Sequence, residues 1–171
     1  KESDRTLAQG TQWNYFNKLN LLLNKAEREE IIPFNPVDRL EKGERPQRAD
    51  PRCTFLVLDE VKKLADTPFR MDKLKRAFLF ACLCGLRISD VRSLQWSSFQ
   101  QDSKGNTIAK LTQKKTKSIL YLPISPEALK QLPQKGNNVD LVFGKLPDNS
   151  YIDKLLKIWA KDAGITKNLT F

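Results

Sequence analysis

The residues best suited to chemistry lie in the segment 82–96, which reads CLCGLRISDVRSLQW. Arg87 follows a glycine, Gly85, at the end of the apolar run 77–83, and Asp90 comes three residues later. A break of this kind between two helices would hold the guanidinium of Arg87 rigidly, and its fork of N–H donors suits bidentate binding of a phosphate. A surface ion pair at a helix junction explains the same residues equally well, so the motif alone leaves both interpretations open.

Lysines form a second candidate group, in the segment 111–124, which reads LTQKKTKSILYLPI. Apolar and polar residues alternate over 107–112 and 118–124, which predicts a β-hairpin with Lys114, Lys115 and Lys117 at its tip. An ammonium beside a phosphate can act as a general acid because lysine changes its protonation state, whereas arginine does not. Taken alone, the lysines are explained more simply as residues that keep a hairpin soluble.

The N-terminal part of the chain is predicted to contain one helix, from Thr6 to Glu30. Its apolar residues recur at helical spacing, and these are Leu7, Trp13, Phe16, Leu19, Leu22, Leu23 and Ala26. The helix ends before Pro33 and Pro36. Residues 40–52 are charged, contain two prolines and one glycine, and lack periodicity, which is typical of a linker.

The remaining chain is predicted to be mainly helical with a small antiparallel sheet. Ser125 is expected to cap a helix, and Ser150 with Asp153 resembles a capping box. Trp13, Phe16, Trp96 and Trp159 are expected in the core because of their helical context. The expected helices span 59–65, 71–84, 88–95, 126–132 and 151–163, with a short buried extended piece at 141–143. Because helices, a hairpin and helices follow in that order, a wound parallel sheet is not expected.

The charge of the chain is unevenly distributed. The net charge is +10, yet residues 1–50 carry nine basic and nine acidic side chains, so the whole excess lies in 51–171. A basic domain favours a polyanionic partner, although a solvated basic surface fits the charge alone equally well. No apolar run is long enough for a membrane span, and no signal peptide is recognisable.

The three cysteines, Cys53, Cys82 and Cys84, have neither the number nor the spacing of a disulfide framework or a zinc site. Cys82 and Cys84 are expected to be buried thiols in an apolar helix. Free thiols indicate a reducing compartment, the cytosol.

Gly85-Leu86-Arg87-Ile88-Ser89-Asp90 resembles the first arginine box of the tyrosine recombinases, the phage integrase family. The resemblance implies that Arg87 binds the scissile phosphate and that Asp90 supports the site. It also implies a general acid on a β-hairpin about eight residues before a proline, here Lys115 before Pro123, which protonates the leaving 5′ oxygen. Lys114 and Lys117 are phosphate contacts or competing candidates for that role, and they join Arg92 as expected DNA-binding residues.

The resemblance also implies a domain organisation. Residues 1–39 would form the C-terminal part of a helical core-binding domain, 40–54 a linker, and 55–171 the N-terminal two-thirds of a catalytic domain. Family members further require a His-x-x-Arg box and a nucleophilic tyrosine, but the 171 residues contain no histidine, and neither Tyr15, Tyr121 nor Tyr151 has the expected surroundings. The chain is therefore expected to end just before that box, and the fragment alone is expected to be inactive.

The functional expectation is a fragment of a site-specific DNA recombinase or integrase of a mobile element. The full-length protein would cut and rejoin double-stranded DNA through a 3′-phosphotyrosyl link, without metal, ATP or another cofactor. By resemblance it would act as a homo-tetramer on DNA in the bacterial cytosol. The alternative is a non-catalytic DNA-binding or regulatory remnant of a recombinase.

Overall fold

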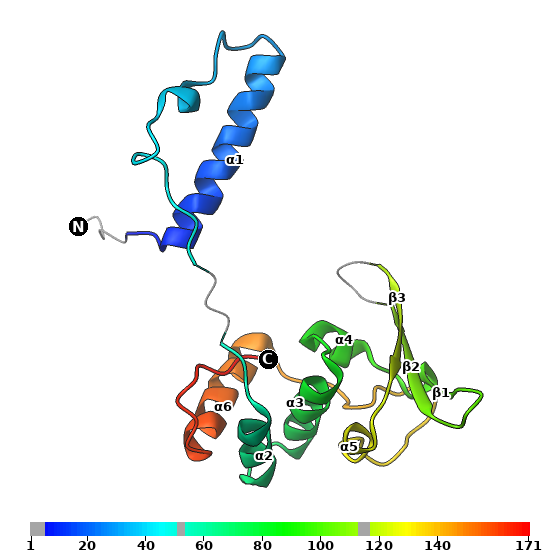
Figure 1. Ribbon diagram of the computed structural model, residues 1–171. Coiled ribbons are helices and arrows are strands. Elements are labelled where there is room, and N and C mark those ends of the chain that lie inside the picture. Colours follow the sequence, from blue (N-terminus) through cyan, green and yellow to red (C-terminus); the bar gives the residue numbers. More distant parts are fainter. Residues whose placement is uncertain (1–5, 51–53, 113–116) are drawn as a thin grey trace. The chain divides into compact units, whose positions relative to one another are not determined.

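The computed structural model of the protein describes residues 6–50, 54–112 and 117–171 (Figure 1). The chain divides into two compact units, Lys1–Cys53 and Thr54–Phe171, here called the N-terminal unit and the C-terminal unit. None of the helices in the described ranges has the length and apolar character needed to cross a membrane.

The N-terminal unit consists of one long helix, α1 (Gln9–Arg28), and a returning segment with a short 3₁₀ helix, η1 (Pro36–Arg39). The predicted helix over 6–30 is confirmed with slightly narrower bounds. Asn35 holds the two parts together: its buried Nδ2 donates to Oδ1 of Asn20 at 2.8 Å and to Oδ1 of Asn24 at 2.5 Å. A buried amide satisfied in this way fixes the turn onto the helix.

The core expected around Trp13 and Phe16 is incomplete. Both side chains are half-buried, and α1 has no fully buried residue. Leu19 and Leu22 are 52% and 64% exposed, because within the described unit only the segment after α1 covers the helix. Arg48 covers part of Trp13, with its guanidinium carbon 5.5 Å from the ring centre.

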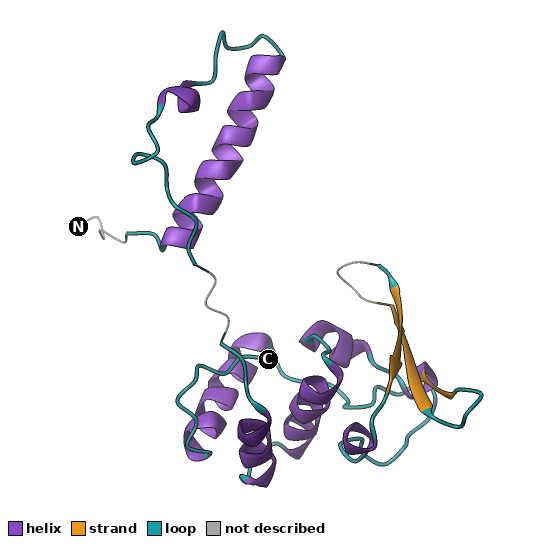
Figure 2. Cartoon of the chain, in the orientation of Figure 1, coloured by secondary structure: helices purple, strands orange, loops and turns teal. Residues whose placement is uncertain are grey.

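The C-terminal unit is mainly helical with one small antiparallel sheet, as predicted (Figure 2). The strands pair in the order β1-β2-β3. The helices are α2 (Leu58–Asp66), α3 (Asp72–Cys84), α4 (Ile88–Ser93), α5 (Pro126–Leu129) and α6 (Asn149–Asp162), with a 3₁₀ turn η2 (Trp96–Ser98). The strands are β1 (Phe99–Gln101), β2 (Thr107–Thr112) and β3 (Ile119–Pro123).

Two local predictions for this unit need correction, and strand β1 was not expected. The piece 141–143, expected to be buried and extended, is buried at Val142 and Phe143, but only Leu141 pairs, in one isolated bridge to Gln95, before the chain turns. The capping box at Ser150 is wrong, because the cap of α6 is Asp148, whose Oδ1 accepts from the Tyr151 N–H at 3.0 Å. Ser150 lies inside the first turn.

The core of the C-terminal unit is built around α3 and α6. Trp159 is fully buried, stacks on Phe69 with ring centres 4.7 Å apart, and meets the edge of Phe78 at 5.8 Å. Its indole N–H donates to the Thr67 carbonyl at 3.2 Å, which satisfies the one polar atom of the ring. Trp96 is also buried, so both tryptophans of this unit lie in the core as predicted.

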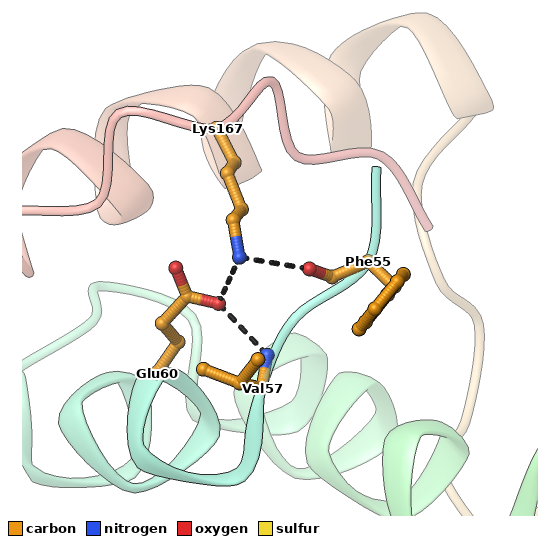
Figure 3. Close-up of polar contacts among 4 residues, drawn as sticks. All are labelled: Phe55, Val57, Glu60 and Lys167. Atoms are coloured by element: carbon orange, nitrogen blue, oxygen red, sulfur yellow. Dashed lines mark hydrogen bonds and ion pairs between the residues drawn. The ribbon is translucent and has the colours of Figure 1, made fainter. Parts of the chain in front are cut away.

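A polar cluster joins the beginning and the end of the C-terminal unit (Figure 3). Lys167 Nζ lies 2.7 Å from Glu60 Oε2 and 2.9 Å from the Phe55 carbonyl oxygen, and the same Oε2 accepts from the Val57 N–H at 2.8 Å. The hydrogen bond from Lys167, followed by that from the Val57 backbone, lowers the pKa of Glu60. Residues more than a hundred positions apart are thereby held in contact.

Candidate functional site

The junction between α3 and α4 places Arg87. Gly85 ends α3 in the left-handed conformation, with φ at 65°, and its N–H donates to the Ala81 carbonyl. The Leu86 N–H donates to the same oxygen at 3.2 Å, and the Leu86 side chain is buried. This is a Schellman-type ending, which reverses the chain within two residues and so begins a new helix at once.

Arg87 is the N-cap of α4, with φ and ψ of −79° and 156°. Its carbonyl accepts from the N–H groups of Asp90 and Val91 at 2.9 and 3.0 Å, which fixes its backbone to the first turn of α4. The side chain is exposed, and among the described residues none forms a hydrogen bond or ion pair with it. The backbone of Arg87 is held by hydrogen bonds and its guanidinium is exposed. Such a group can bind an oxyanion without first breaking an internal ion pair.

Asp90 occupies the first turn of α4, and only 3% of its surface is exposed. The Ser89 hydroxyl donates to its Oδ1 at 3.4 Å. A buried carboxyl group needs hydrogen-bonding partners inside the protein. Asp90 is therefore directed into the C-terminal unit and is not open to a ligand from solvent.

Arg92, predicted as a DNA contact, lies on the same helix but is directed elsewhere. Its guanidinium donates to the Pro147 carbonyl oxygen, which fastens α4 to the segment before α6. Its Nε is buried and has no hydrogen-bond partner among the described residues. One N–H donor of the Arg92 guanidinium therefore links α4 to the segment before α6 and is not available to a ligand.

The hairpin forms as predicted, but Lys114 and Lys115 lie outside the described residues. Lys117, the last of the three lysines, is described: it is exposed, and its φ is 59°. The left-handed region is costly for a side chain other than glycine or asparagine, and such strain often occurs near functional sites. In Figure 1 the start of β3 and helix α4 lie on the same side of the C-terminal unit.

The cysteines before Gly85 differ from the prediction. Cys82 is exposed and Cys84 half-buried, because the last turn of α3 extends past the core. Desolvation of the sulfur nevertheless raises the pKa of each thiol to about 11. Both are poor nucleophiles at neutral pH. Among the described residues there is also no cluster of three or more His, Cys, Asp or Glu that could hold a metal ion.

Basic residues on α6 form a further group, outside the predicted site residues. Lys154, Lys157 and Lys161 are all exposed on this helix. Their spacing of three and four residues is a signal available in the sequence, because it places side chains on one helix face.

Solved structures provide the comparison that decides the fold, since neither models of protein families nor curated proteins match the sequence. A lambda integrase (residues 75–356) dimer bound to a COC′ core site matches 90% of this chain with a TM-score of 0.62 and 19% identity. XerH site-specific recombinase bound to difH substrate, in a pre-cleavage complex, matches 96% of this chain with a TM-score of 0.59 and 14% identity.

The chain has the fold of the tyrosine recombinases. The expected fold, mainly helical with a small antiparallel sheet and similar to that of recombinases, is thereby confirmed. The chain covers 58% of the lambda integrase chain and 51% of the XerH chain, so it spans little more than half of a recombinase of this fold.

Proposed function

We propose that the chain is part of a site-specific tyrosine recombinase or integrase that acts on double-stranded DNA. Residues 1–39 would belong to the core-binding domain, 40–54 to the linker and 55–171 to the catalytic domain. The His-x-x-Arg box and the nucleophilic tyrosine would come from outside these residues, since the sequence has no histidine and its three tyrosines do not match.

The observation that carries the proposal is the α3–α4 junction. The side chain of Arg87 is exposed and has no hydrogen-bond or ion-pair partner among the described residues, while its backbone is fixed as the N-cap of α4. It lies three residues from the buried Asp90. This arrangement suits neutralisation of a scissile phosphate and of the charge that develops when its bond is cleaved. Asp90 would hold the neighbouring positive charges in position.

Lys115 is the proposed general acid, and it would donate its proton to the leaving 5′ oxygen as the phosphodiester bond to that oxygen breaks. The attacking tyrosine oxygen would form the new bond to phosphorus, so that the 3′ phosphate remains attached to the protein. Lys114 and Lys117 would bind nearby phosphates, and so would those N–H donors of Arg92 that Pro147 does not engage. Bond energy is conserved in this exchange, which therefore needs no metal ion, ATP or other cofactor.

The partner is proposed to be double-stranded DNA, which the lambda integrase and XerH structures contain as a core site and a substrate. The basic excess over residues 51–171 supports this partner. A homo-tetramer on paired DNA sites, acting in the bacterial cytosol, completes the proposal for the full-length protein. The 171-residue chain itself would bind DNA without cutting it.

Binding is tested with the 171-residue chain and a fluorescent duplex, by anisotropy over a range of salt concentrations. We expect measurable affinity at about 50 mM salt and a loss of about 10³-fold or more by 200 mM, as for proteins that make several phosphate contacts. Absence of binding at the lower salt concentration would refute the proposal.

The catalytic role of Arg87 is tested in the protein extended by the reading frame beyond Phe171. That frame should encode a His-x-x-Arg box and a tyrosine; an immediate stop codon would favour the non-catalytic DNA-binding remnant instead. Arg87→Ala should abolish strand cleavage and largely spare binding. Arg76→Ala is a matched control, because Arg76 is paired with Asp72 on α3 at 2.7 Å and has no proposed role. Persistent cleavage by Arg87→Ala would overturn the assignment.

A further inference from the structure

Helix α6 carries a row of three exposed lysines, Lys154, Lys157 and Lys161, here called the α6 lysine row. At about 100° per residue the three side chains fall within an arc of roughly 60° around the helix. The buried residues of α6 lie on the opposite face, and these are Ile152, Leu155, Leu156, Trp159 and Ala160. The row therefore points directly away from the core of the C-terminal unit.

Among the described residues no carboxylate is paired with the row. Within the described residues no acidic oxygen lies within 4.0 Å of any of the three ammonium groups. Other helical cations do have such partners: Lys25 pairs with Glu29 and Lys62 with Asp59. Like charges spaced three or four residues apart destabilise a helix, so the unpaired row lowers the stability of α6 unless a polyanion covers it.

The C-terminal end of the row opens onto a surface hollow of about 510 Å³. Lys157 and Lys161 line it together with Thr166, Lys167 and Asn168. The hydroxyl and amide add neutral donors to the ammonium groups, while Lys167 is already engaged by Glu60 and the Phe55 carbonyl. The hollow thus offers several donors to one anionic group at the end of a line of positive charge.

We propose that the α6 lysine row is a second DNA-backbone contact surface, separate from the site around Arg87. In Figure 1, α6 and the β-sheet lie at opposite ends of the C-terminal unit, so the row is remote from strands β2 and β3. From Lys154 to Lys161 the helix rises about 10 Å. A DNA duplex carries one phosphate charge about every 1.7 Å of its axis when both strands are counted, so over about 10 Å it offers a separate phosphate to each of the three ammonium groups.

This inference rests on the proposed DNA-binding function, and salt dependence separates the two. The variant Lys154→Gln/Lys157→Gln/Lys161→Gln removes the row, and Lys62→Gln/Lys104→Gln/Lys135→Gln removes the same charge from exposed positions elsewhere in the unit. Each neutralised phosphate contributes about 0.9 to the slope of log affinity against log salt. The row variant should therefore have a slope shallower by about 2.7.

Between about 50 and 200 mM salt, the unmodified chain should accordingly lose about 40-fold more affinity than the row variant. The control variant should stay within one unit of the original slope. An unchanged slope in the row variant, or an equal change in the control, overturns the inference and leaves DNA binding by the chain intact. If the unmodified chain does not bind the duplex at all, the proposed function fails and this inference fails with it. Circular dichroism of each variant verifies that α6 remains folded.

Discussion

Replacing Gly85 with alanine should destabilise the C-terminal unit through backbone conformation alone. Gly85 has a φ of 65°, a region in which a Cβ atom costs about 1–2 kcal/mol. A Cβ built at this position would meet no atom within 4 Å, so no steric clash with neighbouring residues adds to the cost. Alanine also restricts the unfolded chain, which returns about 0.4–1 kcal/mol.

The expected net loss is therefore about 1 kcal/mol, which corresponds to a fall in Tm of about 4 °C for a domain of this size. Thermal and urea unfolding followed by circular dichroism measure it. Gly85→Asn is the matched variant, because asparagine adopts the left-handed region more readily than alanine does. It should restore part of the lost stability although its side chain is larger.

Two results would contradict this reasoning. One is a Gly85→Ala protein as stable as the original, which would mean that the turn relaxes at no cost. The other is a larger loss for Gly85→Asn than for Gly85→Ala, which would point to crowding instead of backbone conformation. A relaxed turn would also move Leu86 and Arg87, so the alanine variant should bind DNA more weakly than the asparagine variant.

The remaining predictions concern titration. Because the folded-state pKa of Glu60 is lowered, its contribution to stability is present above the ordinary glutamate pKa of about 4.3 and is lost as the pH falls through the folded-state value. Urea unfolding at a series of pH values should therefore show a steeper loss of stability below about pH 4.3 for the original chain than for Glu60→Gln. With pKa values raised to about 11, Cys82 and Cys84 should react with iodoacetamide at pH 8 at least about tenfold more slowly than the same thiols in the unfolded chain.

Each titration experiment has its own control. Parallel acid profiles for the original chain and Glu60→Gln would show that the contacts of Glu60 with Lys167 and Val57 contribute nothing to acid sensitivity. For the thiols, the Cys53→Ser background limits the reaction to Cys82 and Cys84. Equal alkylation rates in the folded and urea-unfolded states would show that the sulfur atoms are fully solvated.

Local signals made the junction and most helices predictable. The apolar run before Gly85 and the polar residues after it identify two helices and the break between them, and the structure adds only the left-handed geometry of the break. Strand β1 was missed because three residues are too few to establish an alternating pattern, and it exists only through pairing with β2. The exposure of Cys82 was missed because the apolar run suggests burial throughout, while the last turn of α3 extends past the core.

Long-range contacts account for the rest. Nothing near Arg92 in the sequence indicates that Pro147 accepts a hydrogen bond from it, since the two are 55 residues apart. The cap of α6 was misplaced by two residues because Asp148 and Ser150 are both good N-cap residues, and the sequence does not rank them. The α6 lysine row, in contrast, is predictable from the sequence, because a spacing of three and four residues places the lysines on one helix face.

The cluster of Glu60, Lys167 and the Phe55 carbonyl has a topological consequence. It holds the first and last segments of the C-terminal unit against each other, so the unit is nearly a closed loop of chain (Figure 3). Domains with adjacent ends commonly tolerate circular permutation. In a protein made of residues 54–171 alone, Phe171 could therefore be joined to Thr54 by a short linker and the chain reopened at the turn around Gly105, where an added Cβ meets no atom within 4 Å. The order of elements along the polypeptide would change while the junction that carries Arg87 remained continuous.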